Sequence, residues 1–488
     1  MSEVNATDLT EINSADDVFA LYSGSGDQAK AGIEVELAFV DPNKTDIPVM
    51  SLSQNDVLKS AAEKALPDSD WIHNEPTSEL LEVVSNAAPF SQAKGIIENI
   101  NHKIKVLSDL AAEQGLKRSY FQELPERTAD DLLSRIVDVE RYNIMYAPYR
   151  EDMKKCVQYF AVCKSNQVSV SAYDMDHMLE NVRRLYTLAP FLFMLTDNSA
   201  GFSEGKTFTG HAGMSLRHNG LLEGRGGVMP YVFTANSGEE FVASHIDHVM
   251  NNPLFMYYDR QGNLTRVPSG DWNVTINSLK NKGLNIASNY YLSQSVMWPD
   301  VKIAALKDGA GNVNGHRFEA RMFGVGVHQH QTAFIITAGL AFNKNFADGV
   351  DTLLAKYGFV NSNLERSYAL LLESYKAARE HNGKFFDIAY GTGTMADFAK
   401  EFAGLIEILA YEEGLTREVS PILKICRTGC TDGKVNRLLC PSLDDVIAFQ
   451  RSYNKEIFED SNKCASMIFE KEISEISSDS CQSSSAVA

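Results

Sequence analysis

The sequence predicts an α+β protein whose sheet is largely antiparallel. From residue 31 to about residue 341, strand-like and helix-like patterns mix irregularly, without the regular strand–helix alternation of a parallel sheet. From about residue 332 onward the strand signals stop, and apolar residues recur every three to four positions, which indicates helices. Of the 488 residues, 44% are hydrophobic, so the chain can bury a sizeable core.

Four regions are predicted along the chain. Residues 1–25 form a short lead-in helix and linker, and residues 26–341 form the mixed α+β domain. Residues 342–470 form a helical C-terminal region, in which Asn382-Gly383 and Gly414 are helix stops. Residues 471–488 are rich in serine, and we expect them to be a disordered tail.

Within the mixed domain, alternating or β-rich runs predict strands, and apolar residues at helical spacing predict helices. The predicted strands are Ile33–Val40, Leu80–Val84, Gln167–Ala172, Gly213–Arg217, Leu254–Tyr258 and Arg317–Phe323. The predicted helices are approximately Ser53–Ala65, Phe90–Glu113, Asp174–Leu195 and Glu239–Met250.

The first predicted strand, GIEVELAFV, carries two carboxylates on one face. Because side chains alternate along a strand, Glu34 and Glu36 point one way while Ile33, Val35 and Leu37 point the other way. Two such carboxylates lie about 7 Å apart. At that distance they repel by roughly 2 kcal/mol at an effective dielectric near 20. The apolar side predicts a core strand, and the acidic side needs a separate explanation.

Three further segments place polar groups opposite or beside an apolar face. In HRFEARMF the polar residues are Arg317, Glu319 and Arg321; in NQVSVSAYD they are Gln167, Ser169 and Ser171; in HNEPTSELLEVVSN they are Glu75, Glu79 and Glu82. For any one of these segments, a half-exposed antiparallel strand is an adequate explanation. Four such segments in one region, rich in Glu and Arg, favour a shared site instead.

The chemistry that suits such a site is phosphoryl transfer. Converging carboxylates require a positive charge between them, and oxygen-only ligand sets suit Mg²⁺ or Mn²⁺. Arginines beside such ions suit phosphate, because a guanidinium binds phosphate oxygens in bidentate geometry. The sequence contains neither GxxxxGK[ST] nor a helix-opening GxGxxG. The glycine-rich run Lys307–Gly315 is interpreted as a hairpin loop.

Charge and composition limit the partners. The net charge of −19 argues against nucleic acid or an anionic membrane as the main partner, and no apolar run is long enough to span a bilayer. The odd number of cysteines, seven, fits a reducing compartment, so we expect a cytoplasmic protein. The spacing of Cys426, Cys430 and Cys440 is a poor match to a zinc site. His245 and His248 are expected at the surface, while His328 and His330 follow the Glu319 strand closely.

Eight fragments together resemble glutamate–cysteine ligases, most of all the branch that includes the plant and proteobacterial enzymes. They occur in the order and approximate spacing of that family, between Gly32 and Phe323: GIEVELAFV, EPTSELLEVVSNAAP, RYNIM, QVSVSAYD, MSLRHN, GRGGVMPYVF, NNPLFMYYDRQGNL and RFEAR. The resemblance implies the catalytic fold of glutamine synthetase, a curved antiparallel sheet with flanking helices. It also implies ATP as co-substrate, two or three Mg²⁺ or Mn²⁺ ions, and ligation of glutamate to cysteine through a γ-glutamyl phosphate.

The resemblance also implies roles for individual residues. Glu36, Glu75 and Glu82 would hold one metal ion, and Glu34 and Glu319 would hold a second. Arg321 would meet the transferring phosphate, and Arg217 would bind glutamate. Arg141, Tyr142 and Met145 would belong to a segment that forms and packs the glutamate pocket. Arg225 would be a second cation at the rim of the substrate site.

The chain departs from the family pattern at two serines. Relatives usually place His or Gln at Ser169 and Asn at Ser171, and a serine hydroxyl is a poorer metal partner than an imidazole. An extra water or Gln167 would then complete the coordination of the second ion. The short loop after Arg217 and the glycine-rich hairpin between Trp298 and Glu319 are further departures, in regions expected to shape the amine pocket, so they bear on the acceptor more than on the reaction. The alternatives are a ligase with a different amine acceptor, or an inactive relative that binds nucleotide or a protein. A monomer and a homodimer are both compatible with the sequence.

Overall fold

The computed structural model describes residues 9–19, 22, 29–44, 48–66, 71–145, 163–219, 224–268, 271, 273–307, 313–361 and 366–452. Three sequence predictions lie wholly or mainly outside these residues: most of the lead-in segment, the tip of the 307–315 hairpin, and the Ser-rich tail 471–488. Among the helices of the described part, none combines the length and apolar character needed to cross a membrane.

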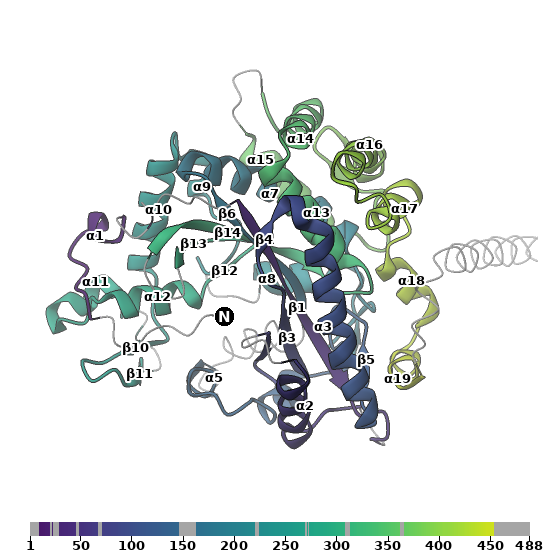
Figure 1. The fold of residues 1–488 in the computed structure, drawn as a ribbon, viewed down its shortest axis with the longest axis horizontal. Helices are drawn as coiled ribbons and strands as arrows, with labels where there is room; N and C mark the ends of the chain where they lie inside the picture. Colours follow the sequence, from purple (N-terminus) through teal and green to yellow (C-terminus); the bar gives the residue numbers. More distant parts are fainter. Residues whose placement is uncertain are drawn as a thin grey trace, which may run out of the picture.

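An eight-stranded sheet forms the centre of the molecule (Figure 1), and all of its strand pairs are antiparallel. The main path runs β13-β14-β6-β1-β3-β2, and β4 and β5 also pair with β1. The strands are β1 (Lys30–Val40), β2 (Ile72–Asn74), β3 (Leu80–Val84), β4 (Ala88–Pro89), β5 (Lys117–Ser119), β6 (Ser165–Ala172), β13 (Val301–Lys307) and β14 (Val313–Gly324). The predicted α+β class with an antiparallel sheet is confirmed.

One face of the sheet is apolar and is covered by three long helices. Ile33, Val35 and Leu37 of β1 are buried in the same core cluster as residues of α3 (Ala93–Glu113), α7 (Met175–Leu195) and α13 (Gln329–Phe342). Helix α3 packs on β1 and β3, α13 on β6 and β1, and α7 on β14 (Figure 1). The predicted alternation along β1 is confirmed, because its apolar side chains point into this core.

Further helices and small strand pairs make up the rest of the described chain before α14 (Lys344–Lys356). The helices are α1 (Ala15–Phe19), α2 (Leu52–Ala65), α4 (Ala129–Leu133), α5 (Glu140–Met145), α8 (Ala212–Asn219), α9 (Tyr231–Thr234), α10 (Gly238–Asn251), α11 (Ile276–Leu279) and α12 (Ala287–Ser295), with 3₁₀ turns η2 (Phe90–Gln92) and η3 (Lys280–Lys282). The small strand pairs are β7 (Phe202–Ser203) with β8 (Lys206–Thr207), β9 (Gly226–Gly227) with β12 (Trp298–Pro299), and β10 (Met256–Tyr258) with β11 (Leu264–Arg266).

Two strand predictions and one histidine prediction need correction. The segment Gly213–Arg217 lies in helix α8, whose first turn is supported by His211: its Nδ1 accepts from the N–H of Met214 at 3.1 Å. A run this short cannot distinguish helix from strand by periodicity. Only Met256–Tyr258 of the predicted strand 254–258 is extended, and it belongs to the separate β10–β11 hairpin. His245 is buried rather than exposed, and it is bonded to Tyr231 and Gln294.

The described residues of the predicted helical region, 342–361 and 366–452, are helical as predicted, apart from one small hairpin; residues 453–470 lie outside the described part. This C-terminal part contains α14 (Lys344–Lys356), α15 (Tyr368–Arg379), β15 (Ala389–Tyr390), β16 (Gly393–Thr394), α16 (Met395–Glu413), α17 (Ser420–Thr428), α18 (Asp432–Leu439) and α19 (Leu443–Ser452). Thr394 caps the start of α16, and Gly414 ends it in the left-handed conformation at φ 69°. These helices continue the apolar core, because Phe191 of α7 packs edge-on against Phe398 and Phe402 of α16.

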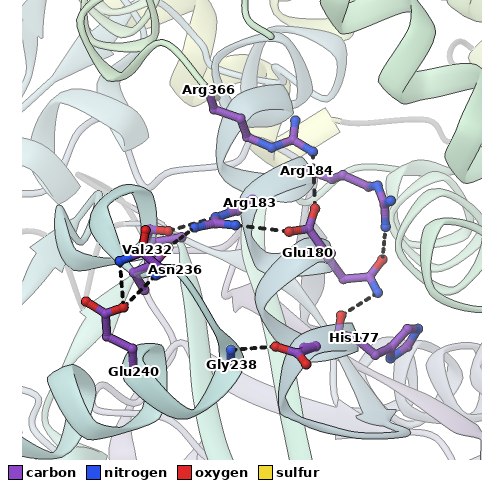
Figure 2. A network of polar contacts seen from close by, with 12 residues as sticks. His177, Glu180, Arg183, Arg184, Val232, Asn236, Gly238, Glu240 and Arg366 are labelled. Carbon is purple, nitrogen blue, oxygen red and sulfur yellow. Dashed lines mark hydrogen bonds and ion pairs between the residues drawn. The ribbon is translucent and has the colours of Figure 1, made fainter. Parts of the chain in front are cut away.

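Charged side chains on α7 fasten the neighbouring elements to it. Figure 2 shows Arg183 donating to the carbonyl of Val232 and pairing with Glu180, which also pairs with Arg366 from the C-terminal part. At the start of α7, a carboxylate oxygen of Asp176 accepts from the N–H of Gly238 at 2.6 Å, which ties α10 to α7. Helix α7 is therefore joined by polar contacts to elements from both halves of the chain.

Candidate functional site

A cluster of three carboxylates lies on the polar face of the sheet. Glu36 of β1 stands directly opposite Glu82 of β3, and Glu75 comes from the loop between β2 and β3. Each offers a carboxylate oxygen, and these atoms all lie within 4.8 Å of one another. Across the described ranges this is the one group of three or more potential metal ligands that converges in this way. The structure thus brings together the residues that the sequence assigned to a first metal ion.

Burial and neighbouring negative charge raise the pKa of two of these carboxylates, Glu36 and Glu75. Burial, followed by the charge of Glu82, raises the pKa of Glu36 to about 7. Burial and then the charges of Glu82 and Glu36 raise the pKa of Glu75 well above its usual value. The N–H of Ser165 and the amide Nε2 of Gln167 each donate to Glu36 at 2.7 Å. Three oxygen donors that repel one another fit a hard divalent cation such as Mg²⁺ or Mn²⁺, which would offset the repulsion.

The two glutamates predicted to hold a second metal ion have a different environment. Glu34 lies opposite Gln167, and Glu319 lies opposite Ser169. Glu319 pairs with Arg321 through Nε at 2.5 Å and with Arg317 at 3.5 Å. Burial alone would raise the pKa of Glu319, but Arg321, Arg317 and Lys302 outweigh it and hold the pKa well below its usual range.

Glu34 responds to its surroundings in the opposite direction from Glu319. Burial, then the charges of Glu82 and Glu319, raise its pKa to about 8. The positive charge next to Glu319 therefore comes from side chains, and these residues offer a cation a less favourable donor set than Glu36, Glu75 and Glu82.

The two serines that depart from the family pattern are both engaged within the sheet. The hydroxyl of Ser169 donates to Glu319 at 3.2 Å, and its oxygen accepts from Arg317 at 2.6 Å. The hydroxyl oxygen of Ser171 accepts from the backbone N–H of Lys30 at 2.8 Å. Ser169 therefore belongs to the Glu319–Arg317 network, and Ser171 fastens β6 to β1.

A pocket opens beside the carboxylate cluster, with about 620 Å³ of free space including its mouth. Helix α8 supplies Arg217, β14 supplies Arg321, and α5 supplies Arg141 and Tyr142, so the lining combines cationic side chains with the acidic Glu36 and Glu75. Nη2 of Arg141 donates to the hydroxyl of Tyr142 at 2.9 Å. The residues around it are Glu36, Glu75, Pro76, Arg141, Tyr142, Met145, Cys163, Ser165, Gln167, Arg217, Ser295, Val296, Trp298 and Arg321.

Several candidates from the sequence lie away from this pocket. Arg225 is buried behind the wall, where Nη1 donates to the carbonyl of Val296 at 2.9 Å and the guanidinium lies over the ring of Phe255. Glu79 pairs with Arg135 at 3.0 Å, outside the carboxylate cluster. His330 is bonded to Asn101 of α3. None of these three lines the pocket formed by the described residues.

The pocket also contains residues that the sequence did not single out for the site. Cys163 and Ser165 precede or begin β6, while Ser295, Val296 and Trp298 lie at the end of α12 and the start of β12. No local motif marks these positions, because residues from β6 and α12 become neighbours only through the tertiary packing of these elements. The alternation of β6 does place Ser165 on the same face as Gln167, and that was the available signal.

The fold and the site together define a mixed α+β protein with a carboxylate cluster and arginines on the polar face of an antiparallel sheet. The model of glutamate-cysteine ligase family 2 matches residues 30–261. The resemblance to that family predicted from the sequence is therefore confirmed over this segment, which includes all three clustered carboxylates and Arg217. Glu319 and Arg321 lie beyond it. No curated protein matches the chain.

Solved structures with some likeness include two enzymes of related name. Glutamate–cysteine ligase from Francisella tularensis, solved with AMP, is 12% identical; the match covers 92% of this chain and 95% of that one, with a TM-score of 0.49. The bifunctional glutathione synthetase from Pasteurella multocida is 10% identical, with 89% and 53% covered and a TM-score of 0.44. This chain thus spans about half of that bifunctional protein.

Proposed function

We propose that this protein is an ATP-dependent ligase that joins the γ-carboxylate of L-glutamate to an amine through a γ-glutamyl phosphate. The observation that carries the proposal is the pocket that is lined both by Glu36 and Glu75, two members of the carboxylate cluster, and by the guanidinium groups of Arg217 and Arg321. A metal-bound nucleotide and an anionic substrate are complementary to these acidic and cationic groups. The family match over residues 30–261 supports the same class of reaction.

The carboxylate cluster beside the pocket fits a divalent cation. Glu36, Glu75 and Glu82 would hold Mg²⁺ or Mn²⁺ through oxygen atoms, the donors that these ions prefer. When bound, such an ion would supply positive charge that offsets the negative charge of the ATP phosphates. Glu34 and Glu319 remain candidates for a second ion. The arginines on Glu319 already supply positive charge there, so we assign no step to that ion.

The reaction itself requires no protein nucleophile. The γ-carboxylate of glutamate attacks the γ-phosphorus of ATP, so that one P–O bond forms and the bond to ADP breaks. Arg321 stabilises the negative charge of the transferring phosphoryl group, and Arg217 binds glutamate. The acceptor amine then attacks the acyl carbon, phosphate leaves, and the amine loses its extra proton to water. Arg321 is oriented for its role by Glu319, which accepts from its Nε at 2.5 Å.

L-Cysteine is the acceptor that this proposal favours, and the product would then be γ-glutamylcysteine, the first intermediate of glutathione synthesis. The family match supports cysteine. Another amine is the alternative, because Ser169 replaces the residue type that relatives usually carry in this part of the site. Both versions share the acyl phosphate and differ only in the acceptor pocket.

The test is an assay of the purified chain with Mg²⁺, ATP and L-glutamate, to which L-cysteine or one of a panel of other amines is added. We expect ADP release that depends on glutamate and acceptor, and a γ-glutamyl product identified by mass spectrometry. Product with cysteine alone supports the favoured version, and product with a different amine supports the alternative. If none of the amines yields a γ-glutamyl product from metal-loaded protein, the proposed reaction is wrong.

Glu75→Gln is the variant that links this activity to the carboxylate cluster. It removes one charged oxygen donor while keeping the shape, so Mn²⁺ binding measured by calorimetry should weaken about tenfold or more. ADP release should fall in parallel. Glu239→Gln, on the exposed start of α10, is the matched control and should change neither quantity. Equal Mn²⁺ affinity in wild type and Glu75→Gln would show that Glu75 does not bind the metal ion.

A further inference from the structure

Two guanidinium groups line the same pocket although they repel each other. Arg217 comes from α8 and Arg321 from β14, and the two side chains are only 4% and 6% exposed. Their elements are more than a hundred residues apart in sequence, so no local turn fixes their separation. A fixed negative group close to both would hold them in place and offset the repulsion between them.

Asp300 supplies such a negative group for Arg217 and a backbone contact for Arg321. It lies between β12 and β13, and its carboxylate oxygen Oδ1 is 3.5 Å from Nη1 of Arg217. Its backbone carbonyl accepts from the N–H of Arg321 at 2.9 Å. The residue is 0% exposed, and it does not belong to the residues that line the pocket. Asp300 thus contacts one arginine by its side chain and the other through the backbone, from behind the pocket wall.

The second carboxylate oxygen of Asp300 is held by two further side chains. The hydroxyl of Tyr375 donates to Oδ2 at 2.7 Å, and Nε2 of His218 lies 3.0 Å from the same atom. The rings of His218 and Tyr375 pack with centroids 4.6 Å apart. Tyr375 lies on α15, in the helical C-terminal part, and is fully buried. The orientation of the carboxylate is therefore set by α8 and α15 together.

The backbone around Asp300 is also fixed. Its N–H donates to the carbonyl of Gly227 at 3.0 Å, which extends the short parallel pairing of β9 and β12. Gly227 has φ 70°, and a Cβ there would lie 3.3 Å from Nδ1 of His218. Glycine at this position therefore suits both the backbone conformation and the close approach of the His218 ring.

We propose that Asp300 is a positioning residue that sets the relative place of Arg217 and Arg321, and that the hydroxyl of Tyr375 holds Asp300 in the required orientation. The C-terminal helix α15 thereby acts on the substrate pocket without touching substrate. The inference rests on the proposed function for its substrate, glutamate, because Arg217 is the residue expected to bind it. The contacts themselves do not depend on that substrate.

The experiment compares Tyr375→Phe and Asp300→Asn with wild type, and uses Tyr390→Phe as the matched control. The hydroxyl of Tyr390, on β15 of the C-terminal part, also makes a buried hydrogen bond, but it donates at 2.8 Å to the carbonyl of Thr187 on α7. The first readout is labelling by phenylglyoxal, an arginine reagent, followed by peptide mass mapping without any substrate. Arg141, which lines the same pocket and bonds to Tyr142, is the internal reference.

We expect Arg217 to label about fivefold faster relative to Arg141 in Tyr375→Phe, and faster still in Asp300→Asn, with Tyr390→Phe like wild type. The second readout is calorimetric binding of L-glutamate in the presence of Mg²⁺. Its Kd should rise about fivefold or more in Tyr375→Phe and not in Tyr390→Phe. A merely structural role of the hydroxyl would lower the melting temperatures of both tyrosine variants and leave both readouts unmoved.

Unchanged labelling of Arg217 in folded Asp300→Asn overturns the proposal. If Asp300→Asn does not fold, Tyr375→Phe decides: labelling and glutamate affinity equal to those of Tyr390→Phe also overturn it. Failure of wild type to bind glutamate counts against the proposed function instead. In that case the labelling result still supports or overturns the positioning role of Asp300, because phenylglyoxal reports on the arginine directly.

Discussion

Glutamates on one polar sheet face differ in protonation according to their neighbours. Glu319 has cations beside it and a lowered pKa, whereas Glu34 and Glu36 lie near other carboxylates and have raised pKa values. All three side chains belong to strands of one sheet, in which β6 lies between β14 and β1. The chemical role of a glutamate here is therefore decided by its cross-strand partners, and the cross-strand pairing is a property of the fold.

Glu123 is a buried carboxyl outside the pocket that should make stability depend on pH. Burial raises its pKa to about 8 from an ordinary value of 4.5, against the hydrogen bond from the N–H of Ala200. A group whose pKa is raised on folding stabilises the fold fully below its unfolded pKa, and this contribution is lost as the pH rises through its folded pKa. The stabilisation should therefore disappear between about pH 5 and about pH 8.

Glu123→Gln removes that proton equilibrium and keeps an oxygen that can accept from Ala200. We expect its melting temperature to fall less than that of wild type between about pH 6 and about pH 9. Thermal unfolding followed by circular dichroism measures this, with Glu239→Gln on the exposed start of α10 as control. A variant whose melting temperature follows that of wild type at every pH would show that Glu123 does not contribute.

Some residues of the site could be predicted from the sequence and others could not. The shared face of Glu34 and Glu36 could be predicted, because strand alternation alone places both side chains on one side. The contact between Asp300 and Tyr375 could not be predicted, because no local pattern relates a residue after β12 to one on α15. The contact depends on the packing of α15 on α7 and α8. The unassigned pocket residues Ser295 and Val296 depend on packing in the same way.

Elements with strong periodicity were predicted from the sequence, and short ambiguous ones were not. Helices α3 and α7 each have 21 residues with a continuous apolar stripe, and both appear where they were expected. The segment that forms α8 has 8 residues, too few for the period to separate helix from strand. Its helical form is nevertheless important, because it places Arg217 and His218 next to Asp300.

The contact between α10 and α7 allows a test with two glycines. A Cβ at Gly238 would lie 2.2 Å from the backbone carbonyl carbon of Met175, so Gly238→Ala must push α10 away from α7. We expect the melting temperature to fall, with a loss of roughly 1–3 kcal/mol in the free energy of unfolding. Chemical denaturation measures this directly.

Gly95→Ala is the matched control in helix α3. A Cβ at Gly95 would have no heavy atom within 4 Å, and alanine is the better helix former. We expect stabilisation by about 0.5–1 kcal/mol. The close packing of α10 on α7 would be contradicted if Gly238→Ala proved as stable as wild type.

At the scale of the whole molecule, one apolar core joins the two regions that the sequence separated at about residue 341. The core cluster contains Val35 of β1, Phe191 of α7 and Phe402 of α16. The sequence showed the change from mixed to helical patterns correctly, but a change of pattern does not reveal whether two regions share a core. The boundaries 26–341 and 342–470 remain a hypothesis about domains.

A shared core predicts cooperative unfolding of both regions. Calorimetry of the full chain should give one transition, with calorimetric and van't Hoff enthalpies that agree. A chain truncated after about residue 343 should expose the core face of α7 and fail to fold. Two separate transitions, or a well-folded truncated chain, would show instead that the helical region is an independent domain.

The strand order of the sheet has a consequence for the chain while it is being made. The carboxylates of Glu36, Glu75 and Glu82 are all present once β1, β2 and β3 have been synthesised, and those strands are neighbours in the sheet. Arg321 arrives with β14, and Tyr375 later still. Because synthesis proceeds from the N-terminus, the nascent chain carries these carboxylates well before Arg217 and Arg321. Only after α15 has emerged from the ribosome can Asp300 gain its last partner.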